Sequence, residues 1–306
     1  MQPFIAALMA GVLVCVCAAP LLAMEAGNAK ETVLHSFAGG AGGADPEAGL
    51  VAVNGMLYGT TYEGVGTGCN KNFGCGTVFA IDAKTGAERV VYSFCSQPNC
   101  ADGQYPFAGL IAVKGMLYGT TNFGGAYGYG TAFALDPKTG AETVLHAYGS
   151  GTDGFSPDGG LIAVKGTLYG TTDAGGVGYC NPYGCGTVHS LDPKTGAETV
   201  LYSFCSLQDC GDGMFPTAGL IEANGTLYGT TFYGGNKGCE RQGCGTVFAL
   251  DPATGAETVL HTFCPHGNCA DGEMPEAGLV EVDGTLYGTT VFGGANGEGT
   301  EFAVKP

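Results

Sequence analysis

Residues Leu57–Thr61 read LYGTT, and the same five letters return four more times along the 306-residue chain. The later copies begin at Leu117, Leu168, Leu227 and Leu286, so successive copies lie 60, 51, 59 and 59 residues apart. Self-similarity at a period of this length is typical of proteins built from one repeated structural unit. The chain is therefore expected to contain five copies of one unit.

Three further short pieces recur around each LYGTT. In the first full copy they are Ala48–Val53, Gly76–Asp82 and Glu88–Phe94. Each is rich in Val, Ile, Leu, Thr, Phe or Tyr and is bounded by Gly, Pro, Asp or Asn, which is the pattern of short β-strands. Pairs such as Asn54-Gly55 suit tight hairpins, because Asn and Gly accept a positive φ. The unit is therefore predicted to be a four-stranded antiparallel meander.

A four-stranded unit of this length is typical of a β-propeller blade. One strand pattern, Glu31–Phe37, stands alone before the first full unit, whereas the last unit, Ala277–Val304, has only three strands. We therefore predict an all-β fold, a five-bladed β-propeller of four-stranded antiparallel blades. Pairing of the N-terminal strand Glu31–Phe37 with Gly299–Val304 would complete the last blade and close the ring without an exposed sheet edge.

The repeat also resembles a known family through the run DGxxPxAGL…LYGTTxxGG…GTVFALD…ETVLYSF. The pattern is complete at Asp271-Gly272, Pro275, Ala277–Leu279, Leu286–Thr290 and Gly293-Gly294. It resembles the GloVer tandem repeat of exported bacterial "choice-of-anchor" proteins and covers residues 31–306. The resemblance implies export and a repeat-built β domain, and implies no established activity. The chain departs from the pattern in its longer DPKTGAE turns, in its cysteine pairs and in ending at Lys305-Pro306 without a C-terminal anchor.

The first residues predict export. Residues 5–23 form an apolar run, and we expect a signal peptide over residues 1–26, cleaved near Ala23 or Ala26, followed by one propeller domain over residues 27–306. An uncleaved membrane anchor is the alternative, because the run is near the length of a spanning helix. The net charge of −17, with only 11 Lys and Arg, argues against nucleic acid and anionic membranes as partners. The protein is expected to be secreted, periplasmic or on the cell surface.

Twelve cysteines of the predicted domain form six close pairs, which appear and vanish as units. The pairs are Cys69/Cys75, Cys95/Cys100, Cys180/Cys185, Cys205/Cys210, Cys239/Cys244 and Cys264/Cys269. Export favours local disulfides. Zinc binding is the alternative, although four or five residues separate the members of each pair and no four-cysteine cluster is evident. The meander would place all six loops on one face of the propeller, where binding usually occurs.

Two sets of side chains are candidates for ligand binding on that face. The first is a ring of carboxylates near the central channel, able to bind a cation or ligand hydroxyl groups, with capping of a turn as the alternative: Asp45, Asp102, Asp153, Asp212 and Asp271. The second is a group of loop aromatics that could stack on sugars, with packing of the loops as the alternative: Tyr127, Tyr183 and Tyr233.

No nucleophile–histidine–acid set stands out from the repeat. His35, His146 and His261 alternate with tyrosine at one strand position, while His189 replaces a phenylalanine of the other copies. We therefore expect no cofactor and, rather than an enzyme, a binding or interaction module whose extracellular ligand is a glycan or a protein. A propeller-type glycan hydrolase or lyase, in which distant blades supply two carboxylates, and a structural surface or matrix protein remain alternatives.

Overall fold

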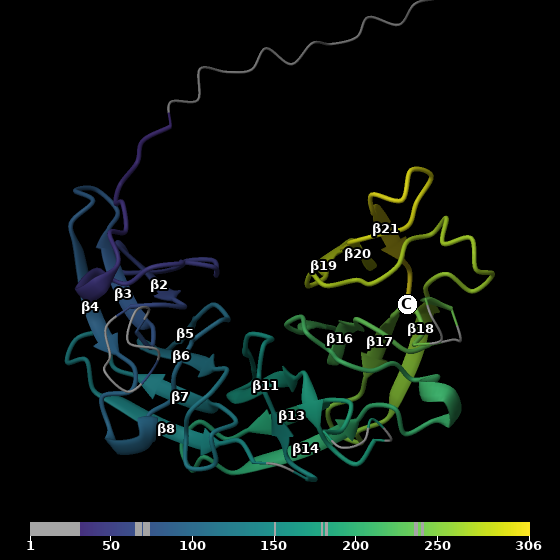
Figure 1. Cartoon of the computed structure of the whole chain (residues 1–306), viewed down its shortest axis with the longest axis horizontal. Coiled ribbons are helices and arrows are strands. Elements are labelled where there is room, and N and C mark those ends of the chain that lie inside the picture. Colours follow the sequence, from purple (N-terminus) through teal and green to yellow (C-terminus); the bar gives the residue numbers. More distant parts are fainter. Residues whose placement is uncertain are drawn as a thin grey trace, which may run out of the picture. The chain divides into compact units, whose positions relative to one another are not determined.

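Apart from residues 31–37, the predicted strands of the repeat are present, and the fold is all-β (Figure 1). The structure, a computed structural model, describes residues 31–64, 69, 74–149, 151–178, 180, 183–235, 238–239 and 242–306. The predicted signal peptide lies outside these residues. Residues 34–306 cluster into one unit. Among the described residues, no helix has the length and apolarity needed to cross a membrane.

Five sheets follow one another along the chain, each with its strands in sequence order. Sheet 1 contains β1 (Val51–Val53), β2 (Met56–Thr61), β3 (Thr77–Asp82) and β4 (Glu88–Ser93). Sheet 2 contains β5 (Ile111–Val113), β6 (Met116–Thr121), β7 (Thr131–Leu135) and β8 (Glu142–Ala147). Sheet 3 contains β10 (Ile162–Val164), β11 (Thr167–Thr172), β13 (Thr187–Leu191) and β14 (Glu198–Ser203).

Sheet 4 contains β15 (Ile221–Ala223), β16 (Thr226–Thr231), β17 (Thr246–Leu250) and β18 (Glu257–Thr262). Sheet 5 contains β19 (Val280–Val282), β20 (Thr285–Thr290) and β21 (Thr300–Val304). The short strands β9 (Gly154–Phe155) and β12 (Ala174–Gly175) pair with each other. Three single turns of 3-10 helix have bounds within the described residues: Gly40–Gly42, Pro98–Cys100 and Gln208–Cys210.

The LYGTT motif builds the centre of each sheet. Gly59 of β2 lies beneath the ring of Phe79, and a Cβ added there would be 2.5 Å from that ring, so only glycine fits. Thr61 Oγ1 and Thr77 Oγ1 are hydrogen-bonded at 2.8 Å inside the sheet. Thr60 Oγ1 donates to the Ala108 carbonyl of the next sheet at 3.2 Å. The motif therefore joins each sheet internally and to its successor.

Successive sheets pack through a repeated apolar contact, which we call a seam. Sheets 1 to 4 each place an aromatic ring, at the end of the fourth strand, against the third strand of the next sheet. The ring centroids of Phe94 and Phe133 are 5.1 Å apart, and those of Phe204 and Phe248 are 5.0 Å apart. Burial of each such ring contributes about 1.5–3 kcal/mol. The first strands β1 and β5 also contact each other, as do β5 and β10.

Sheet 5 differs from the prediction. It has three strands, and residues 31–37 form no strand, so the predicted pairing of Glu31–Phe37 with Gly299–Val304 is not seen. Residues 34–37 lie instead against sheet 1, where the rings of Phe37 and Phe79 are 4.9 Å apart. The edge of β21 therefore has no neighbour among the described residues, and the predicted closed ring is not confirmed.

Candidate functional site

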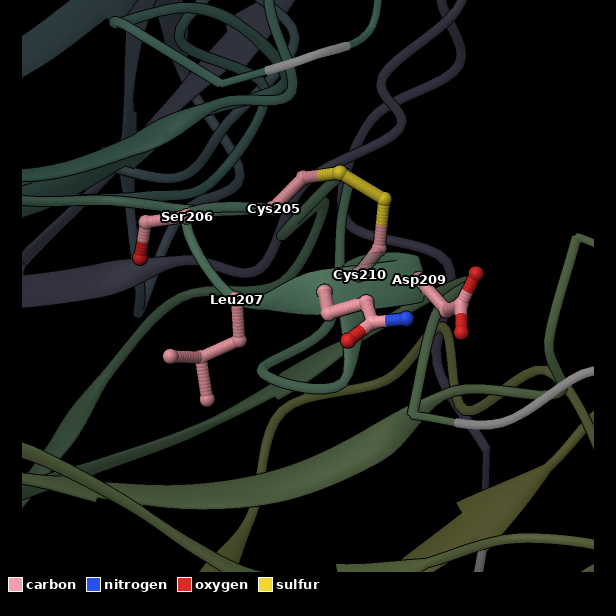
Figure 2. A pocket seen from close by; sticks show the side chains of 6 residues that line it. Cys205, Ser206, Leu207, Asp209 and Cys210 are labelled. Carbon is pink, nitrogen blue, oxygen red and sulfur yellow. A yellow bond between two sulfur atoms is a disulfide. The ribbon is translucent and has the colours of Figure 1, made fainter.

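All six predicted cysteine pairs are disulfides in the structure. They lie on what we call the loop face, the end of the sheets that carries the loops after the second strands and the segments after the fourth strands. Figure 2 shows one of them, Cys205–Cys210, which closes a loop around a hollow of about 430 Å³ lined also by Leu207 and Asp209. Such bridges are consistent with an oxidising, extracytoplasmic location.

The disulfides gather in pairs, which the sequence reasoning did not foresee. In sheets 1, 3 and 4 both disulfides of a sheet meet, and their four sulfur atoms lie within 4.8 Å of one another. The clusters are Cys69/Cys75/Cys95/Cys100, Cys180/Cys185/Cys205/Cys210 and Cys239/Cys244/Cys264/Cys269. Each cluster fixes the loop after a second strand to the segment after the fourth strand of the same sheet. The signal was present in the sequence, because each sheet has either four cysteines or none.

Two of the predicted ring carboxylates are structural caps. Asp102 is fully buried and accepts hydrogen bonds from Tyr92 Oη, from Ser96 N–H and Oγ, and from Gln97 N–H. Asp212 repeats this arrangement with Tyr202, Ser206 and Leu207. Both carboxylates therefore hold the backbone of a disulfide loop, the alternative considered from the sequence.

Asp45 is not equivalent to the other four aspartates. Its φ of 54° matches that of Tyr105, at 59°, and the adjacent bridge between Ala44 and Glu63 matches the bridge between Gln104 and Phe123. Gly42 lies as far before β1 as Asp102 lies before β5, so a glycine takes the place of the other four aspartates in this copy. Asp45 therefore occupies a different place from the one predicted.

Asp153 and Asp271 accept hydrogen bonds from histidines instead of tyrosines. His146 Nε2 lies 3.2 Å from Asp153 Oδ2, and His261 Nε2 lies 3.1 Å from Asp271 Oδ2. Both histidines belong to fourth strands, so these carboxylates lie against the last strand of a sheet. The first strands, which contact one another between sheets, are at the other side, and the predicted position near a central axis is not what these contacts show.

The predicted loop tyrosines fall into two classes. Tyr127 and Tyr183 are exposed, and Tyr183 continues a row of rings through Phe155 to Tyr129. Tyr233 is half-buried between Phe215 and Phe232 and packs the loop.

A polar group beside the first strands was missed from the sequence. Tyr62 stacks on Tyr105 at 4.9 Å, Asn122 Nδ2 donates to Asp158 Oδ1, and Asp173 follows β11. We call these five residues the inner rim. Burial, and then the neighbouring Asp173, raises the pKa of Asp158 to about 7, and burial also raises the pKa of Asp173. Half-buried carboxyl groups with raised pKa values in a loop region are candidates for ligand contact.

The seam between sheets 2 and 3 contains a second unforeseen group. Tyr148 and His189 replace the phenylalanines of the other seams and are fully buried, with Tyr148 Oη 2.8 Å from His189 Nε2. Burial lowers the pKa of His189 to about 4, so its ring is neutral at pH 7. Both departures are visible in the sequence, but only the structure shows that they are partners.

Comparison with known proteins identifies a family and a general architecture. The model of the Gloeobacter/Verrucomicrobia repeat matches residues 21–181 and 177–306. No curated protein matches the sequence.

Three solved structures are similar at low sequence identity. A chain of the nidogen/laminin complex is 12% identical, with a TM-score of 0.47 over 83% of this chain and 77% of that chain. Oligogalacturonate lyase in complex with manganese is 12% identical, with a TM-score of 0.46 over 82% of this chain and 62% of that chain. The extracellular domain of the one-component system BT4673 from B. thetaiotaomicron is 9% identical, with a TM-score of 0.51 over 84% of this chain and 27% of that chain. This chain thus spans less than two thirds of the latter two, and the similarity concerns the fold alone.

Proposed function

Because the chain belongs to the Gloeobacter/Verrucomicrobia repeat family, we propose that it is a closed five-bladed propeller acting as an extracytoplasmic binding module, with a glycan as ligand on its loop face. The observation that carries the binding proposal is the inner rim, where an aromatic stack adjoins an amide and two half-buried carboxyl groups. Family and fold do not specify a ligand, so the chemistry of these side chains is the basis for the choice.

Closure is supported by two exposed apolar faces, one on sheet 1 and one on sheet 5, which correspond to the two sides of an internal seam. The leucine before the first strand is 2–6% exposed in sheets 2 to 5, but Leu50 of sheet 1 is 52% exposed. Conversely, the tyrosine of LYGTT is 5% exposed at Tyr58 but 43% exposed at Tyr287 of sheet 5. Contact between sheet 5 and sheet 1 would bury both, as it does at the internal seams.

Hydrogen bonding supports the same closure. At the seams, the N–H of Tyr105 donates to the Cys75 carbonyl, and the N–H of Phe215 donates to the Cys185 carbonyl, each at 2.8 Å. The equivalent groups of the open pair are the Asp45 N–H and the Glu298 carbonyl. Residues 31–36 would then pair with β21 in the register of sheet 4, where Val259 faces Phe248, so that Val33 faces Phe302.

Hydrogen exchange tests the closure. The amides of Thr300–Val304 should be protected as strongly as those of Thr246–Leu250, and deletion of residues 31–37 should remove the protection from the first segment only. Fast exchange of Thr300–Val304 in the full chain would contradict the closed ring.

A glycan suits the inner rim for two physical reasons. Aromatic faces such as the Tyr62–Tyr105 stack provide apolar surface for sugar rings. Asn122 has an unpartnered buried Oδ1, and Asp158 with its raised pKa supplies a further polar group, so hydroxyl groups of a sugar would find partners there. The acidic chain as a whole disfavours a polyanionic ligand.

A glycan array tests the ligand proposal. Binding by the wild-type protein should weaken at least tenfold in Tyr62→Ala and in Asp158→Asn, whereas Lys138→Ala, in the turn between β7 and β8, should bind normally. Absence of any glycan signal, or equal binding by all variants, would contradict the proposal.

The neighbouring carboxyl groups Asp158 and Asp173 favour a second candidate, a propeller-type glycan hydrolase. Two carboxyl groups in unequal environments can serve as acid and base. Release of reducing ends from polysaccharides, lost in Asp173→Asn, would establish catalysis in place of simple binding.

A further inference from the structure

The seam between sheets 2 and 3 brings three potential metal ligands together. His146 Nε2 lies 3.2 Å from Asp153 Oδ2, and a carboxylate oxygen of Glu198 joins them, with all three atoms within 4.8 Å of one another. His146 and Asp153 come from β8 and the segment after it, whereas Glu198 begins β14 of the next sheet. The group therefore bridges two sheets.

We propose that His146, Asp153 and Glu198 form a binding site for one divalent first-row transition cation, such as Zn²⁺ or Mn²⁺. Ligand atoms about 2.0–2.2 Å from a common ion lie roughly 3.0–3.5 Å apart, which is the separation of the His146 and Asp153 atoms. One imidazole and two carboxylates favour these cations over Cu⁺, which prefers sulfur, and over Mg²⁺ and Ca²⁺, which prefer all-oxygen sets.

The equivalent group at the neighbouring seams is closed to an ion. There Asp102 is fully buried and takes four hydrogen bonds, two of them from Ser96. Sheet 2 lacks the disulfide loop, and among the described residues Asp153 accepts the N–H groups of Gly149 and Gly154 besides the bond with His146. The side chains of His146 and Asp153 are 21% and 24% exposed, so a cation can reach them.

Unsatisfied polar atoms lie at the same seam. Glu198 Oε1 is buried without a hydrogen-bond partner. Behind the site, the ring of His146 packs at 5.0 Å on Tyr148, whose hydroxyl is bonded to the fully buried His189, and His189 Nδ1 has no partner. Tyr148 thus positions the His146 ring, and the polar pair replaces the two phenylalanines of every other seam.

A bound cation would link two sheets, one of which has no disulfide of its own. Sheet 2 has no cysteine, whereas sheets 1, 3 and 4 each have two disulfides. An ion held by His146, Asp153 and Glu198 would join the fourth strands of sheets 2 and 3. The proposed role of the metal is therefore structural, and it is independent of the glycan proposal.

The chain supplies its own matched variant for a test. Tyr92 and Tyr202 occupy the position of His146 at the neighbouring seams, so His146→Tyr should fold while removing the imidazole. Titration calorimetry of tag-free, non-reduced protein with Zn²⁺ and with Mn²⁺ should show one site per chain for at least one of them. We expect affinity to fall at least tenfold in His146→Tyr and in Glu198→Gln, and to remain unchanged in His261→Tyr. Melting temperature should rise with metal in the wild type and in His261→Tyr, and should rise less in His146→Tyr and in Glu198→Gln.

Three results would overturn the proposal: no saturable binding by the wild type, unchanged affinity in His146→Tyr, or unchanged affinity in Glu198→Gln. Co²⁺ absorption gives an independent readout, because a nitrogen and oxygen ligand set produces a visible band without the intense charge transfer of thiolates. Cobalt spectra dominated by thiolate bands would assign the ion to the cysteines and would also overturn the proposal.

Discussion

The seam between sheets 3 and 4 and the seam between sheets 2 and 3 solve one packing problem with different chemistry. The first packs Phe204 on Phe248 and caps its loop with a buried Asp212. The second packs Tyr148 on His189 and leaves Asp153 partly exposed beside His146. Because the strand register is the same in both sheets, the difference lies in the side chains and in the segment after the fourth strand. The repeat therefore supplies a frame in which one seam can gain polar groups without a change of fold.

Exchange of the aromatic partners between the seams should have the largest effect. Phe248→His should cost about 3–5 kcal/mol, because a fully buried imidazole would face Phe204, which offers no hydrogen bond. The double variant Phe204→Tyr/Phe248→His should recover part of this loss by recreating the pair of Tyr148 and His189. Urea unfolding measures both. Equal stability of single and double variants would show that the Tyr–His pair depends on its own seam.

Removal of the disulfides should come next in size. Each closes a short loop, so replacement of Cys205 and Cys210 by serine should cost about 2 kcal/mol. Replacement of Cys180 and Cys185 should cost a similar amount, and the four-serine variant should deviate from additivity by about 0.5–1 kcal/mol, because the two bridges are in contact. Strict additivity in thermal unfolding would show that the clusters are not coupled. The seam between sheets 2 and 3 is the internal reference, because sheet 2 has no disulfide.

Removal of a capping carboxylate should cost less stability, and the loss should differ between the two seams. Asp212→Asn should cost about 2 kcal/mol, because it removes an acceptor from a fully buried side chain that takes four hydrogen bonds. Asp153→Asn should cost about 1 kcal/mol, because the side chain is partly exposed and has fewer donors. Denaturant midpoints compare the two variants. An equal loss of stability would contradict the view that, of these two aspartates, only Asp212 is a fully buried cap.

The repeat explains what the sequence could predict. Period, strand patterns and hairpins such as Asn54-Gly55 follow from local chemistry, so the sheets and the local disulfides were predictable. The pairing of residues 31–37 was inferred from closure, a long-range contact that local pattern does not specify. Asp45 was misplaced because Gly42 occupies the aspartate position of this copy and the nearby Asp45 was taken in its place. Tyr148 and His189 lie 41 residues apart, and their partnership depends on the seam, which no local motif encodes.

Ionisation of the glutamates at the seams should have the smallest effect on stability. Burial raises the pKa of Glu142, Glu198 and Glu257 to about 7, with a further contribution from Asp102, Asp153 and Asp212 respectively. A folded-state pKa above the unfolded value near 4.5 means that this stabilisation is complete below about pH 4.5 and is lost as the pH rises through 7. Because these side chains are partly exposed, we expect each to contribute only about 1 kcal/mol after screening.

Urea midpoints between pH 5 and 8 should therefore fall with pH in the wild type, and the slope should flatten in Glu142→Gln and in Glu257→Gln. Glu198→Gln should flatten it equally in metal-free buffer. A saturating metal should remove the Glu198 part only, because a carboxylate that ligates an ion is deprotonated throughout this range. If metal left the pH dependence of the wild-type urea midpoint unchanged, Glu198 would not be a ligand of the ion. The seam between sheets 2 and 3 would then differ from the other seams in packing only.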